Sequence, residues 1–209
     1  IAYQGSVDHR DSGGNKGTIA PGDVQWMTAA SGVVHEEMHG REFTRQGGVF
    51  EMVQLWVNLP RKDKMSAPKY QSITKEQIPV VALGEGATAR VIAGELNGAR
   101  GPASTFTPMN VWDLRLEAGH RVALDLPEGH TTALFVLRGA IRLGERHTVR
   151  AAELAVMERE GRELAFDVAD DTTLLLLNGQ PIDEPIVGHG PFVMNSHEEI
   201  VQAFHDFNG

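Results

Sequence analysis

Cysteine is absent from this chain of 209 residues, and long hydrophobic runs are absent as well. Without cysteine there is no disulfide framework, zinc–thiolate site or thiol nucleophile, so histidine and carboxylate side chains are the only strong metal ligands available. The lack of cysteine is consistent with a cytoplasmic protein, which is the location that we predict. Apolar runs such as Leu174 to Leu177 are far shorter than the roughly 20 residues of a membrane-spanning helix, so we expect no membrane association.

Positive charge is scarce too. The chain has 19 Lys and Arg residues against 28 Asp and Glu residues, which gives a formal net charge of −9. The densest basic cluster, Arg61 to Lys64, is too small to follow a phosphate backbone, so we predict no direct binding of nucleic acid. Hydrophobic residues make up 41% of the chain, enough for the core of one large domain or two small ones.

What the chain does contain is a long series of short strand patterns. Gly, Pro and Asp turns separate them about every 8 to 12 residues, which is the rhythm of a β-sandwich or β-barrel. The series pauses at the linker-like segment Asn97 to Pro102 and then begins again. We therefore predict an all-β protein with an N-terminal domain at residues 1–100, a similar C-terminal domain at residues 106–185, and a C-terminal segment at residues 186–209.

The C-terminal segment has a different pattern. Ser196 and Glu199 have the spacing of a capping box, in which each side chain bonds to the backbone of the other residue. The apolar residues that follow have helical spacing: Ile200, Val201, Ala203, Phe204 and Phe207. The chain is therefore predicted to end in one amphipathic helix.

The stretch Val33 to Met38 (VVHEEM) carries the residues with the clearest chemistry. Successive side chains of a strand point to opposite faces, so His35 and Glu37 would share one face. An imidazole and a carboxylate that converge on one point suit a divalent first-row metal such as iron, nickel or manganese. Two ligands hold a metal poorly, so further ligands must come from another strand. The alternative is a solvated strand face that binds no metal.

His39 has the same parity as His35 but is predicted not to be a ligand. On a straight strand the two residues would lie about 13 to 14 Å apart, whereas metal–nitrogen bonds are near 2.1 Å. His120 and His130 each follow a glycine in a turn and are predicted to be turn residues. The other histidines lie in expected loops or on the terminal helix, so we expect them at the surface: His9, His147, His189, His197 and His205.

The segment Phe50 to Leu59 alternates between apolar and mixed positions, which predicts a half-buried strand. Its mixed face carries Met52, Gln54 and Trp56, followed by Asn58. We predict that Met52, Gln54 and Trp56 line a substrate pocket beside the metal site. An ordinary contact between sheets or domains would account for this face equally well.

Three segments carry a resemblance to a known family. They are PGDVQWMTAASGVVHEEM at residues 21–38, EMVQLWVNLPRKDKM at residues 51–65 and EPIVGHGPFVMNSHEEIVQAF at residues 184–204. Together they resemble the pirin family of the cupin superfamily, over a range from about Gly5 to Phe207. The resemblance implies two tandem cupin barrels of the jelly-roll type, the first with a metal and the second without metal ligands.

The resemblance also implies how the metal is held. Pirins bind one metal, usually iron, through three histidines and one glutamate, and His35 and Glu37 occupy the third and fourth ligand positions. The first two histidines of the family belong to an HPHRGFE-type segment, which we expect upstream of Ile1. We predict one divalent metal, with Fe(II) first and nickel, manganese, copper, cobalt or zinc as alternatives.

Three functions are compatible with such a barrel. As in bacterial pirins, it would be a dioxygenase that acts on quercetin-like flavonols with O2, with Glu37 as ligand and catalytic proton acceptor. As in eukaryotic pirins, it would be an iron-dependent module that binds a protein partner and co-regulates transcription without turnover. A metabolite sensor is the third interpretation. We place the enzyme first, as a monomer that binds a small aromatic substrate.

Overall fold

The computed structural model describes residues 1–209, and they pack as two compact units. Unit 1 comprises residues 1–72 and 182–209, and unit 2 comprises residues 73–181. Short strands make up most of the regular structure, so the all-β prediction is confirmed. No helix in the structure combines the length and the hydropathy that crossing a membrane requires.

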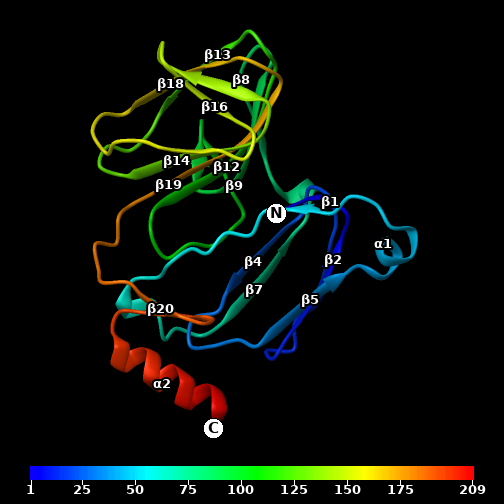
Figure 1. The fold of residues 1–209 in the computed structure, drawn as a ribbon, viewed down its shortest axis with the longest axis vertical. Helices are drawn as coiled ribbons and strands as arrows, with labels where there is room; N and C mark the ends of the chain where they lie inside the picture. Colours follow the sequence, from blue (N-terminus) through cyan, green and yellow to red (C-terminus); the bar gives the residue numbers. More distant parts are fainter. The chain divides into compact units, whose positions relative to one another are not determined.

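Unit 1 consists of short strands in four small sheets, ordered β3-β2-β5, β4-β7, β1-β6 and β20-β21 (Figure 1). Its strands are β1 (Ala2–Gln4), β2 (Val7–Asp11), β3 (Lys16–Ile19), β4 (Val24–Thr28), β5 (His35–His39), β6 (Glu51–Met52), β7 (Lys69–Ile73), β20 (Val187–His189) and β21 (Phe192–Met194). Its helices are α1 (Arg41–Gln46), the 3-10 turn η1 (Arg61–Asp63) and α2 (His197–Asn208).

A tight turn joins β2 to β3. The backbone N–H of Gly14 donates to the carbonyl of Asp11, and the N–H of Asp11 donates to the carbonyl of Asn15. Gly14 has φ +84°, a conformation that side chains disfavour, so this turn needs a glycine. Strand β3 pairs with one edge of β2 and strand β5 pairs with the other edge, so β2 is the central strand of its sheet.

The C-terminal helix α2 begins as predicted. The Ser196 hydroxyl accepts a hydrogen bond from the Glu199 N–H, and the Glu199 carboxylate accepts one from the Ser196 N–H. The apolar face of α2 packs on the hairpin β20-β21, where the Phe192 ring lies 5.0 Å from that of Phe204 and 6.0 Å from that of Phe207. The prediction of a capped amphipathic helix is confirmed.

Unit 2 is a jelly roll of two main sheets, ordered β17-β14-β19-β12-β9-β8 and β13-β18-β15-β16, and the short strands β10 and β11 pair as a third sheet. Alternate residues of both sheets fill one core, in which Trp112, Leu114 and Phe166 are buried. Its elements are η2 (Lys75–Gln77), β8 (Val80–Gly84), β9 (Ala87–Ala93), β10 (Glu95–Leu96), β11 (Ala99–Arg100), β12 (Met109–Leu116), β13 (Arg121–Asp125), β14 (Thr131–Arg138), β15 (Ala140–Leu143), β16 (His147–Arg150), β17 (Leu154–Val156), β18 (Glu163–Val168) and β19 (Thr172–Gly179).

Two features differ from the sequence-based expectation. Residues 73–100 pack with unit 2 rather than with the predicted domain 1–100, because β9 pairs with β12 of the larger sheet. The predicted strand at residues 50–59 is only two residues long, β6. Beyond β6 the N–H of Val53 bonds to the carbonyl of Ile1, and residues 53–59 belong to no strand.

Candidate metal centre

Two paired strands of unit 1 gather the polar residues of the candidate site. Strands β2 and β5 are antiparallel, and their register places His9 opposite Glu37 and Asp11 opposite His35. Residues directly opposite each other on an antiparallel pair point to the same face of the sheet. One face of this ladder therefore carries an imidazole and a carboxylate from each strand.

Three of these side chains converge. Ligand atoms of His9, His35 and Glu37 all lie within 4.8 Å of one another. The Glu37 Oε1 atom is 3.9 Å from the Nδ1 atom of His9 and 3.9 Å from the Nδ1 atom of His35. The structure thus brings together the pair that the sequence singled out and adds a third residue to it.

The third residue, His9, corrects an expectation. The sequence pattern predicted a surface loop at this position, whereas His9 lies on β2 with a fully buried side chain. The local sequence contained one signal, the spacing His9-x-Asp11, which repeats the His-x-Glu spacing of β5. What it did not contain was the pairing of the two strands, which are more than 20 residues apart in the chain. That pairing turns two ordinary motifs into one cluster.

The His9 ring is oriented by Asp11. The His9 Nε2 atom lies 3.3 Å from Asp11 Oδ2, and because a carboxylate only accepts hydrogen bonds, Nε2 is the protonated nitrogen. The other ring nitrogen, Nδ1, is buried and has no hydrogen-bond partner. Carboxylate–histidine pairs of this kind orient metal ligands. A cation bound between the unprotonated form of this nitrogen and the Glu37 carboxylate would give both groups a partner.

Asp11 is itself firmly held. Burial raises the pKa of its carboxyl group, but hydrogen bonds from the Asn15 side chain and backbone, together with His9, outweigh this effect and leave the pKa below its ordinary value. The Asn15 N–H donates to Oδ1 at 3.0 Å, and its Nδ2 donates to both oxygens at 3.1 and 3.0 Å. Asp11 therefore remains an anion that accepts the His9 proton.

A second sheet of unit 1, formed by β4 and β7, supplies side chains that contact the cluster of His9, His35 and Glu37. Gln25 Nε2 donates to Glu37 Oε1 at 2.7 Å, and the Tyr70 hydroxyl lies 3.4 Å from Gln25 Oε1. The Tyr70 ring stacks on His9, with ring centroids 4.7 Å apart and planes 10° from parallel. Burial and the negative charges of Asp11 and Glu37 raise the pKa of Tyr70, so its hydroxyl keeps its proton.

The other residues considered from the sequence lie apart from this cluster. His39 contacts Phe43 and Phe50 instead, with ring centroids 5.7 and 4.8 Å away, and it is absent from the group of potential ligands. Of the predicted pocket residues, Met52 packs on the small core formed by Ala2, Val7 and Ile19. Gln54 is exposed, and Trp56 is 67% exposed. Their role in a substrate pocket stays a prediction.

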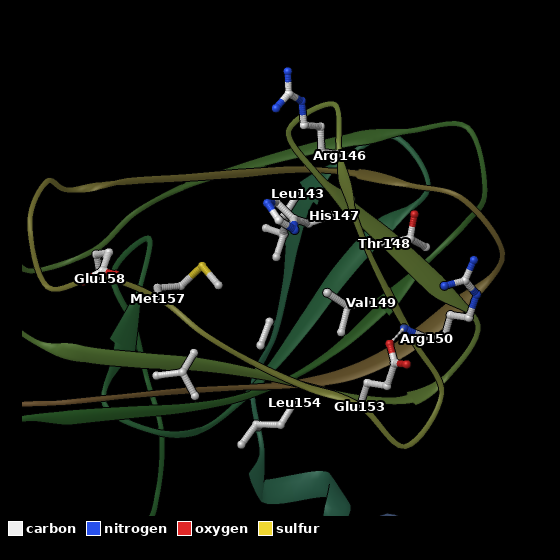
Figure 2. A pocket seen from close by; sticks show the side chains of 12 residues that line it. Leu143, Arg146, His147, Thr148, Val149, Arg150, Glu153, Leu154, Met157 and Glu158 are labelled. Atoms are coloured by element: carbon white, nitrogen blue, oxygen red, sulfur yellow. Dashed lines mark hydrogen bonds between the residues drawn. The ribbon is translucent and has the colours of Figure 1, made fainter.

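Unit 2 offers no comparable group. A groove in unit 2 is lined by residues of β15, β16 and β17 and of the segments that adjoin them, among them His147, Glu153 and Glu158. Figure 2 shows Val149 and Met157 beside this groove and Arg146 pointing away from it. No three potential ligand residues of unit 2 lie close enough together to hold one ion. The candidate metal centre is therefore in unit 1.

The donor set fits a transition metal. His9, His35 and Glu37 offer two imidazole nitrogens and one carboxylate oxygen, the combination that non-haem Fe(II) oxygenases use with further positions left open. His9 is buried and His35 is 34% exposed, so the cluster reaches from the interior of unit 1 to its surface. The composition of the site therefore suits a metal that also accepts an external ligand.

Comparison with known families gives two family matches in this chain. The model of the Pirin domain matches residues 1–57, and the model of the Pirin C-terminal cupin domain matches residues 111–209. A Pseudomonas aeruginosa protein named "Putative quercetin 2,3-dioxygenase" is 53% identical over 208 residues, which cover 99% of this chain and 72% of that protein. The chain belongs to the pirin family. The resemblance inferred from the sequence is thereby confirmed.

Other proteins similar to this chain include a pirin and a solved dioxygenase structure. Mouse pirin is 38% identical over 208 residues, which cover 97% of this chain and 69% of mouse pirin. A crystal structure of quercetin 2,3-dioxygenase from Acinetobacter baumannii superposes with a TM-score of 0.96 and 53% identity, over 100% of this chain and 73% of that one. The prediction of two cupin domains with a C-terminal helix is confirmed.

Proposed function

We propose that this pirin is a metal-dependent dioxygenase that acts on quercetin-like flavonols with O2. The observation that carries the proposal is the cluster of His9, His35 and Glu37, in which a buried imidazole nitrogen without a hydrogen-bond partner faces a carboxylate oxygen. The names of the Pseudomonas and Acinetobacter relatives, both 53% identical to this chain, support the same reaction. Fe(II) is the metal that we place first.

His9, His35 and Glu37 would have different roles in this reaction. His9, oriented by Asp11, and His35 would each present an imidazole nitrogen to the metal, and Glu37 would present Oε1. A bound divalent metal would act as a Lewis acid that lowers the pKa of the flavonol hydroxyl and brings the substrate together with O2. The Glu37 carboxylate would accept the proton of that hydroxyl. Gln25 holds Glu37 in place during this transfer through its 2.7 Å hydrogen bond.

The test is flavonol turnover together with metal content. We expect the chain loaded with Fe(II) to bleach quercetin absorbance in air and not under nitrogen. His35→Ala should lose both bound iron and turnover, because one of the metal ligands is removed. His147→Ala, an exposed histidine on β16 of unit 2, is the matched control and should keep both. Normal iron content in the His35 variant would refute the site, and an iron-loaded chain that leaves quercetin unchanged would refute the reaction.

A further inference from the structure

Tyr70 contacts His9 of the candidate metal centre directly and is connected to Glu37 through Gln25. Its ring stacks on His9 at 4.7 Å, and its hydroxyl reaches Gln25, which bonds to Glu37. Tyr70 belongs to β7 and Gln25 to β4, whereas His9 and Glu37 belong to β2 and β5 (Figure 1). The residue therefore links the sheet that carries the potential ligands to a second sheet of unit 1.

The hydrogen bonds through Gln25 have a defined direction. The ionised carboxylate of Glu37 can only accept, so the amide nitrogen of Gln25 must face it. That leaves the amide oxygen toward Tyr70, and the hydroxyl of Tyr70 must donate to it. In this order, the Tyr70 hydroxyl supports the Gln25 orientation that the Glu37 carboxylate requires, and Gln25 holds the Glu37 oxygen that faces both histidines.

The neighbouring strand β3 leaves space for the Tyr70 hydroxyl. A Cβ atom at Gly17 on β3 would lie 3.2 Å from the Tyr70 hydroxyl oxygen, tighter than ordinary van der Waals contact. Gly17 is not in a left-handed conformation, so its backbone alone does not require glycine. The missing side chain at this position leaves the Tyr70 hydroxyl its space.

We propose that Tyr70 is a positioning residue of the metal centre, which holds His9 by stacking and holds Glu37 through Gln25. The proposal rests on the proposed metal site but not on the flavonol reaction. Strand pairing fixes the backbones of His9 and Glu37, yet each side chain keeps rotamer freedom that metal binding must remove. A tyrosine that restrains both side chains lowers that cost, and outer partners of this kind change metal affinity by about 10- to 100-fold.

The experiment separates the hydroxyl from the ring. Tyr70→Phe removes the hydroxyl and keeps the stacked ring, Gln25→Ala removes the intermediate residue, and the double variant combines them. Thr18→Val is the control, because it removes a hydroxyl on β3 that bonds to Asp8 and not to the site. Two quantities are measured on the full chain: the affinity for Co(II), followed by its visible absorption bands, and the NMR shifts of the Gln25 amide and Glu37 carboxyl groups without metal.

We expect Tyr70→Phe to shift the Gln25 and Glu37 resonances and to weaken Co(II) binding by about 10-fold, at the lower end of the range of outer-partner effects. Gln25→Ala should weaken it further, and adding Tyr70→Phe to Gln25→Ala should change little more, because the hydroxyl acts through Gln25. The Thr18 variant should match the unmodified chain.

Fully additive losses in the double variant, or unchanged resonances in Tyr70→Phe, would overturn the proposal. The metal-free resonances can be read even if no metal binds, and Co(II) binding can be read even if quercetin is not a substrate. Failure of the positioning role is thus distinguishable from failure of the proposed function.

Discussion

At the scale of single residues, His9 decides whether unit 1 offers two potential ligands or three. Its ring is buried, its Nε2–H is taken by Asp11, and its Nδ1 faces Glu37. His9→Phe would keep an aromatic ring against Tyr70 and remove both nitrogens. We expect iron or Co(II) affinity to fall by at least about 10- to 100-fold. The measurement is metal titration of the purified variant.

The matched control for that prediction is His39→Phe. His39 lies on β5 with the parity of His35 but among the rings of Phe43 and Phe50, so the same substitution there should leave metal affinity unchanged. Equal affinities for the His9 and His39 variants would show that His9 is not a ligand.

Glu37 allows a second prediction at this scale. Glu37→Gln keeps the shape of the side chain but removes its charge and its ability to take a proton. We expect metal binding to weaken by about 10- to 100-fold and quercetin turnover to fall further. Glu36→Gln is the control, because Glu36 lies on the opposite face of β5 and pairs with Arg10. Turnover per bound metal that is unchanged in Glu37→Gln would remove Glu37 from the proton transfer.

At the scale of elements, helix α2 depends on its first turn. The Ser196 hydroxyl bonds to the Glu199 N–H, which would otherwise have no partner within the helix. Replacing an N-cap serine with alanine typically costs about 0.5 to 2 kcal/mol. We therefore expect Ser196→Ala to lower the free energy of unfolding by about 1 kcal/mol, measured by urea denaturation. Ser31→Ala, at an exposed turn position, should leave the unfolding midpoint unchanged. Equal midpoints for the two variants would argue against a stabilising cap.

At the scale of the whole molecule, stability should fall in acid. Four carboxyl groups have pKa values below the ordinary 3.8 for Asp and 4.5 for Glu. Asp125 is lowered by its hydrogen bonds from Arg162, Glu76 and Glu198 by backbone N–H groups, and Asp11 by Asn15 despite the opposing effect of burial. These groups stabilise the folded state fully when the pH is above their pKa values in the unfolded state. That stabilisation is lost as the pH falls through their lower pKa values in the folded state.

The measurement is the urea midpoint at pH 7 and at pH 3, which we expect to be lower at pH 3. Asp125→Asn removes one of the four groups, so the difference between the two midpoints should shrink in that variant. A midpoint that does not change between these pH values would contradict the prediction.

The amino-acid sequence by itself determined the features that depend on local patterns, namely the short strands, the start of α2 and the side-chain faces within one strand. Turn residues at short intervals predicted a long series of short strands, and the spacing of Ser196 and Glu199 predicted the start of α2. The parity of His35 and Glu37 predicted that they share a face, because that geometry is built into one strand.

Only the tertiary structure decided which distant strands became neighbours. The register between β2 and β5 placed His9 opposite Glu37, and the contact with β7 brought Tyr70 onto His9. The alternation at residues 50–59 predicted one strand, of which the structure has the two residues of β6. Local sequence specifies which faces a strand presents, whereas pairing depends on hydrogen bonds and packing between segments far apart in the chain, so the site of this pirin could be read only in part from its sequence.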